Sequence, residues 1–219
     1  LDPDSADIME DYVSLLTFSG QLEASRKVAD RMIELDPYVP VFQNAMVALL
    51  EAQGENELKA KAIGIALEIN PDLPNLQMVR FDEMLRTGQF AAARDYVKQM
   101  SELRFEHANL FEQLDWVESQ GKSGKVPDPL YSPSVAFHAD RYDIWLATVM
   151  ESKEEWVEWF ISPLLELYSP SAPAEKLHRF RSDPSTKAYL EDLRLPEYWR
   201  EVGWPDMCQP IGKGDFSCG

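Results

Sequence analysis

The 219-residue sequence predicts an all-α fold, a solenoid of helical hairpins followed by a helical C-terminal cap. Two markers each recur every 34 residues, the glycines Gly20, Gly54 and Gly88 and the prolines Pro3, Pro37 and Pro71. A fixed period of this size is typical of stacked supersecondary units rather than of one globular core. Apolar residues at helical spacing on both sides of each glycine are the third observation, and they make each unit a pair of helices.

The first hairpin is expected over residues 7–35. Its helices span residues 7–18 and about 22–35, and Gly20 separates them because glycine tolerates the left-handed conformation that ends a helix. Asp36-Pro37 ends the second helix, since the residue before a proline avoids helical geometry. The predicted apolar faces are Ile8, Tyr12, Leu15 and Leu16 on the first helix, and Val28, Met32 and Leu35 on the second.

The next two units repeat this pattern. Pro40 and Pro74 stand at helix starts, where a missing N–H costs nothing. Gly54 and Gly88 make the turns, and returning helices are expected at residues 58–69 and 91–103. Loops this short force antiparallel helix pairs.

A further helix over residues 106–120 would begin a partial fourth unit. A loop rich in Gly, Pro and Ser follows at residues 121–134. The C-terminal cap is expected from residue 135 to 219, with helices at residues 135–150, 153–168, 174–181 and 185–193 and an irregular tail. Asp183 is expected to cap the last of these helices, with Pro184 in its first turn.

The repeats resemble the tetratricopeptide repeat family over about residues 1–120. Besides the period, small residues stand at the points of close helix contact, and an aromatic residue, Phe90, follows the third turn. These small residues are Ala29, Ala66 and Ala93. The resemblance implies a right-handed superhelix of three units and a partial fourth. Two positions depart from the family: Lys59 replaces the preferred alanine, which indicates a local shift of register, and Phe105 replaces a proline.

The C-terminal tail resembles that of large bacterial regulatory proteins, in which a helical repeat region trails a winged-helix, TolB-like or nucleotide cyclase domain. The matching residues are Asp183-Pro184, Leu193 to Pro196, Tyr198-Trp199, Gly203-Trp204-Pro205, Cys208, Pro210, Gly212, Asp215-Phe216 and Cys218. The resemblance implies a bacterial signalling parent. Leu1-Asp2-Pro3 repeats Leu35-Asp36-Pro37, which is expected if the chain is a piece of a longer protein.

The net charge of −17 and the pI near 4.5 argue against binding to nucleic acid or to anionic membranes, which favour a basic face. The sequence contains no run of about 18 apolar residues that would span a bilayer and no signal-peptide pattern. A cytoplasmic location is favoured, and a periplasmic one would follow if the parent protein is membrane-anchored.

The sequence offers little catalytic or metal-binding chemistry. Residues 121–125 (GKSGK) lack the first glycine of a phosphate loop, because Trp116 occupies its place and a helix precedes the loop. His107, His138 and His178 stand alone, and no nucleophile pattern occurs. We therefore predict no enzyme activity, no cofactor and no metal site.

The two cysteines, Cys208 and Cys218, are too few for a disulfide framework or for a structural zinc site. Ten residues apart in a turn-rich segment, they can form one disulfide or remain two free thiols.

The resemblance places the first helix of each unit on a concave groove, and the predicted function is protein–protein interaction through that acidic surface. The expected groove residues are Asp7, Glu10, Asp11, Ser14, Asn44, Glu51, Asn75, Met78, Asp82, Asn109, Glu112 and Trp116. The family's carboxylate clamp of Lys, Asn and Arg is absent, because the corresponding positions are Glu10, Ser14, Ala45, Asn75 and Val79. A basic or amphipathic helical segment is therefore the expected partner.

The six tryptophans lie in the second half of the chain and admit two interpretations. They can form the core of a cap that covers the last repeat, or an exposed patch for docking to another domain or to a second copy. An oligomerisation module and a small-ligand sensor with a pocket between repeats and cap therefore remain alternative functions. The tryptophans are Trp116, Trp145, Trp156, Trp159, Trp199 and Trp204.

Overall fold

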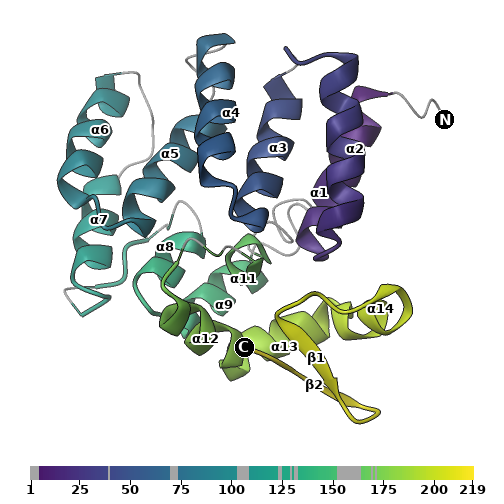
Figure 1. The fold of residues 1–219 in the computed structure, drawn as a ribbon. Coiled ribbons are helices and arrows are strands. Elements are labelled where there is room, and N and C mark those ends of the chain that lie inside the picture. Colours follow the sequence, from purple (N-terminus) through teal and green to yellow (C-terminus); the bar gives the residue numbers. More distant parts are fainter. Residues whose placement is uncertain are drawn as a thin grey trace.

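The computed structural model is mostly helical, which confirms the all-α prediction (Figure 1). It describes residues 5–38, 40–69, 74–102, 109–122, 125–128, 130, 133–151, 164–168, 170 and 172–219. The start of the helix predicted at residue 106, most of that predicted over residues 153–168, and Leu1 to Pro3 lie outside the described residues, as do Phe105, His107, Trp156 and Trp159.

The first part of the chain forms three successive helical hairpins. They are α1 (Ala6–Phe18) with α2 (Leu22–Leu35), α3 (Pro40–Gln53) with α4 (Asn56–Ile69), and α5 (Pro74–Arg86) with α6 (Phe90–Glu102). Figure 1 shows these helices side by side in a row, with α7 (Leu110–Glu118) beside α6. The hairpin turns fall at the three glycines that the sequence predicts.

The same hydrogen-bonded turn recurs at each of these glycines. Gly20, Gly54 and Gly88 adopt the left-handed conformation, with φ of 81°, 74° and 69°. In each turn the residue after the glycine donates its N–H to the carbonyl five residues earlier, as Gln21 does to Leu16 at 2.8 Å. This bond pairs a helix-terminal carbonyl that would otherwise lack a partner. The glycine period thus reflects one repeated backbone requirement.

Small residues allow the helices to pack closely. Ala29, Ala66 and Ala93 are completely buried, as their place at the predicted contact points requires. The first two hairpins share a buried cluster in which α1 contributes Met9 and Val13. The apolar faces predicted for the first hairpin are only partly buried. Leu16 and Met32 are buried, whereas Ile8, Tyr12, Leu15 and Leu35 are exposed. The prediction for α1 was wrong because the helix turns the side with Met9, Val13 and Leu16 inward and leaves the side with Ile8 in solvent.

The described residues of the C-terminal half form short helices and one β-hairpin. These are α8 (Pro133–His138), α9 (Tyr142–Glu151), α11 (Leu165–Tyr168), α12 (Ala174–Ser182), α13 (Pro184–Asp192), α14 (Leu195–Val202), β1 (Cys208–Ile211) and β2 (Asp215–Cys218). Asp183 caps α13 by accepting the Ser185 N–H at 2.8 Å, as predicted. The predicted helix over residues 135–150 is instead two helices, because Asp140 adopts a left-handed backbone that ends α8.

The tail that was predicted to be irregular forms regular structure. Its first part is α14, and its end is an antiparallel hairpin in which Cys208 pairs with Cys218. These two residues form a disulfide, so the structure selects the bonded alternative. Phe216 is buried and packs edge-on to Trp199, which attaches the hairpin to the core.

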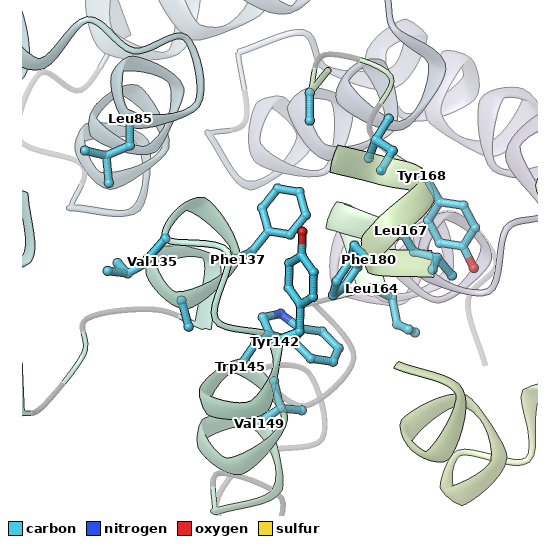
Figure 2. Close-up of a cluster of buried hydrophobic side chains, with 14 of the residues drawn as sticks. Leu85, Val135, Phe137, Tyr142, Trp145, Val149, Leu164, Leu167, Tyr168 and Phe180 are labelled. Atoms are coloured by element: carbon cyan, nitrogen blue, oxygen red, sulfur yellow. The ribbon is translucent and has the colours of Figure 1, made fainter. Parts of the chain in front are cut away.

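An aromatic cluster holds the C-terminal half together. Figure 2 shows Phe137, Tyr142 and Trp145 converging on Phe180, and the Phe180 ring lies 5.0 Å from both Phe137 and Trp145 between centroids. Trp116, Trp145 and Trp199 are buried in the protein's own core. They therefore offer no surface to a second copy, and their arrangement is that of a core.

This core does not simply cover the last hairpin, since it also reaches the first turn. Tyr168 Oη donates to the Phe18 carbonyl at 3.0 Å, and Trp199 Nε1 donates to the Ser19 carbonyl at 2.8 Å. Both acceptors are carbonyls at the C-terminal end of α1, which has no further helical turn to pair them. The C-terminal half therefore runs along the turns of the hairpins, below the row in Figure 1.

We expect Gly20→Ala to destabilise the protein more than Gly88→Ala. Both substitutions force alanine into the left-handed region, at a cost of about 1–2 kcal/mol. A Cβ at position 20 would also lie 2.9 Å from Pro205 Cβ and 3.0 Å from Tyr168 Cε1, whereas one at position 88 meets nothing within 4 Å. Urea unfolding measures the difference, and equal losses would show that the C-terminal half does not pack on the first turn.

Candidate functional site

The predicted groove residues divide into exposed and buried sets. Among those whose side chains are described, Asp11 and Glu112 are exposed, and Asn44, Asp82 and Asn109 are half-buried. Asn109 Nδ2 donates to the Asp128 carbonyl at 3.1 Å. The side chains of Asp7, Asn75 and Met78 lie outside the described part of the structure. These five described side chains leave an acidic and amide-bearing surface on α1, α3, α5, α7 and the residue that precedes α7.

The remaining predicted groove residues are buried. Trp116 belongs to the main apolar cluster, and Ser14 Oγ donates to Glu10 Oε1 at 3.4 Å within α1. Glu51 lies in a buried group of charges. A partner has little access to these side chains, so they act inside the protein. Periodicity placed them correctly on the first helix of each unit but did not distinguish the exposed side of that helix from the packed one.

The buried charges join α3, α4 and α5. Lys59, which is only 3% exposed, forms ion pairs with Glu51 and, at 2.6 Å, with Glu83. Arg86 pairs with Glu83 and approaches Glu51 Oε1 at 3.3 Å. Two cations thus face two carboxylates, which offsets the cost of removing each charge from water. Burial lowers the pKa of Lys59, and the hydrogen bond that its ammonium group donates to Glu51 opposes that shift.

Lys59 occupies the position of an alanine without any shift of register. It follows Gly54 by five residues, as Ser25 follows Gly20 and Ala93 follows Gly88, and Ser25 and Ala93 are completely buried. The predicted local slip is therefore wrong. The polar position is accommodated because carboxylates of α3 and α5 surround the ammonium group. No periodic pattern in the sequence predicted that Glu83 and Arg86 belong to this charge group. The lysine at an alanine position was visible in the sequence, but it indicated buried ion pairs rather than a shift of register.

A second polar group lies where the C-terminal half meets the hairpins. Glu166 on α11 is buried and hydrogen-bonds to Ser134 on α8, while its Oε2 has no hydrogen-bond partner. Asp82 on α5 lies 3.2 Å from His138 Nε2 on α8. Burial raises the pKa of Glu166 to about 8, and the charges of Asp82 and Glu51 add to the rise. This carboxyl group is therefore protonated at neutral pH.

A cavity of about 320 Å³ lies beside these groups, between α5, α7, α8 and α12. It has the size of small-molecule sites. Lys176 Nζ donates to the His138 carbonyl at 2.9 Å and pairs with Asp140 at 3.2 Å, and Arg179 pairs with Asp140 at 3.4 Å. Burial lowers the pKa of Lys176. The ionisable residues of the lining are Arg86, Glu118, His138, Asp140, Glu175, Lys176 and Arg179.

The described residues contain no cluster of three or more His, Cys, Asp or Glu side chains that could hold a metal ion. No helix in the same part of the chain is both long and apolar enough to cross a bilayer. Lys122 and the half-buried Gly121 belong to the loop after α7. Ser123 and Gly124 of the same glycine–lysine motif lie outside the described residues.

No family model, curated protein or solved structure matches the chain.

We expect Glu166→Gln to stabilise the protein at alkaline pH. The folded pKa of about 8 lies above the ordinary value of 4.5, so the folded protein retains a proton that the unfolded chain has lost. Stability therefore falls as pH rises from about 4.5 to 8, by up to about 1.4 kcal/mol per pH unit. Glutamine removes this loss, so the Tm advantage of the variant should be small at pH 5 and should grow towards pH 9.

The control is Glu191→Gln, which removes an exposed carboxylate on α13. Thermal unfolding followed by circular dichroism at a series of pH values makes the comparison. A Tm difference for Glu166→Gln that stays constant from pH 5 to pH 9 would contradict the protonated buried carboxyl group.

Proposed function

We propose that this protein is a protein–protein interaction module of the tetratricopeptide repeat type, the regulatory or sensory part of a larger bacterial signalling protein. The observation that carries the proposal is the set of three helical hairpins closed by one repeated glycine turn. Short repeated hairpins of this kind cannot bury all their apolar surface alone, and stacking leaves extended faces that suit long partner segments.

Charge supports a basic or amphipathic partner. The chain carries a net charge of −17. The accessible residues of the predicted groove are acids and amides: Asp11 and Glu112 are exposed, and Asn44, Asp82 and Asn109 are half-buried. An acidic surface speeds encounter with a basic segment and repels an acidic one. Binding would weaken with salt, because exposed charges are screened at high ionic strength.

We expect the double variant Asn44→Lys/Glu112→Lys to weaken binding of a fluorescein-labelled lysine–leucine amphipathic peptide, measured by fluorescence anisotropy at low salt. Both side chains reach solvent, so the substitutions should leave the Tm nearly unchanged. The matched control is Glu197→Lys/Gln209→Lys, which alters exposed residues of α14 and β1 by the same total charge. If the two variants bind the peptide equally weakly, net charge alone causes the effect, and this result would contradict a groove on the first helices.

A small-ligand sensor is the second candidate function, and the cavity beside α12 favours it. Residues of both the hairpins and the C-terminal half line the cavity, so a ligand bound there would contact both parts. Arg179, which is more than half exposed, is the cation on its wall that can turn towards a ligand at least cost.

A metabolite that carries a carboxylate or phosphate should raise the Tm in a thermal-shift screen, and Arg179→Ala should remove that rise. The control is Arg194→Ala, which removes a cation outside the cavity lining. A rise that survives Arg179→Ala would place the ligand elsewhere.

A further inference from the structure

Helix α11 lies where two apolar clusters meet. The first two hairpins bury one cluster, which contains Ala29 and Met32 of α2. A second cluster joins the third hairpin to the C-terminal half and includes Leu167 of α11. The helix packs against α3 of the second hairpin and against α12 of the C-terminal half (Figure 1). A contact between separate clusters can open while each cluster stays packed.

The polar groups at this contact are acids from three helices. Glu166 of α11 is buried and hydrogen-bonds through Oε1 to Ser134 of α8, and its Oε2 has no hydrogen-bond partner. Asp82 of α5 and Glu51 of α3 are close enough for their charges to act on this carboxyl group. A buried carboxylate beside two others is unfavourable, so the closed contact retains the proton on Glu166.

The other ionisable groups around α11 do not supply a positive charge to Glu166. Arg181 on α12 donates its Nε–H to a backbone carbonyl of α11 at 2.9 Å. His138 on α8 lies 3.2 Å from Asp82. Burial raises the pKa of Tyr189 on α13, and the charge of Glu166 adds to the rise. The cations of the neighbouring charge group, Lys59 and Arg86, are paired with Glu51 and Glu83.

We propose that the contact of α11 with α3, α5 and α8 is a pH-dependent latch, which opens as Glu166 loses its proton and then gives a basic partner access to Asp82 and Glu51. This inference rests on the proposed interaction function, because both acids belong to the predicted groove. In the closed state Glu51 is only 8% exposed and Asp82 is half-buried. Opening therefore adds two carboxylates to the acidic surface.

The direction of the pH effect follows from proton linkage. Burial, with the charges of Asp82 and Glu51, raises the pKa of Glu166 to about 8 in the closed state, whereas the ordinary value is 4.5. Opening exposes the carboxyl group to water and releases a proton wherever the pH lies between these values. The opening constant should therefore rise about tenfold per pH unit in this range and level off above about pH 8.

Hydrogen exchange of the full chain, followed by mass spectrometry and corrected for the intrinsic pH dependence of exchange, tests the latch. We expect the protection of the α11 amides to fall about tenfold per pH unit between about pH 5 and pH 8. Protection in α2 should stay constant, because its buried residues belong to the other cluster. Glu166→Gln should abolish the fall. Ser134→Ala removes a hydrogen bond that favours the charged carboxylate, so the fall should continue to higher pH.

Two controls identify the titrating group. Glu191→Gln removes an exposed carboxylate of α13 and should leave the fall unchanged. Histidine also changes charge between pH 5 and 8, so His138→Gln should retain the fall if Glu166 is responsible. Circular dichroism verifies that all variants are folded. Constant α11 protection in the unaltered chain, an equal fall in Glu166→Gln, or loss of the fall in His138→Gln would overturn the proposal. A parallel fall in α2 would also overturn it, because the whole chain would then be unfolding.

Binding of the lysine–leucine peptide tests the access to the acids. Its affinity should rise with pH more steeply for the unaltered chain than for Glu166→Gln, whose latch stays closed. Equal pH dependence in the two chains would overturn the proposed access. A peptide that binds at no pH would contradict the interaction function, whereas the exchange experiment would still decide whether the latch exists.

Discussion

The left-handed glycine at each hairpin turn is the constraint on which the rest of the structure depends. It lets the following N–H reach back to a terminal carbonyl of the first helix, so each pair of helices reverses direction within two or three residues. The absence of a side chain also lets other parts of the chain approach. Tyr168 and Pro205 occupy the space where a Cβ on Gly20 would lie, and Pro170 does so at Gly54. The glycines thus shape the hairpins and the surface on which the C-terminal half packs.

Polar groups at those contacts give the arrangement specificity that apolar packing alone would not provide. Trp199 and Tyr168 each satisfy one terminal carbonyl of α1, and such a carbonyl would be costly to bury unpaired. Lys59 ties α4 to carboxylates of both α3 and α5, so the second hairpin cannot slide on the third without separating charges. Buried ion pairs add little net stability but penalise wrong packing, and we infer that here they define the register between units.

Periodicity predicted the helices and turns well because a backbone requirement repeats in the sequence. Gly20, Gly54 and Gly88 all have the predicted conformation, and Ala29, Ala66 and Ala93 are buried as expected. The candidate site was predicted less well, because the side of a helix that is exposed depends on neighbours that come from elsewhere in the chain. Glu51 and Trp116 follow the helical pattern of accessible residues but pack against other elements. The interaction of α11 with α8 through Glu166 and Ser134 carries no local signal, since 32 residues separate them.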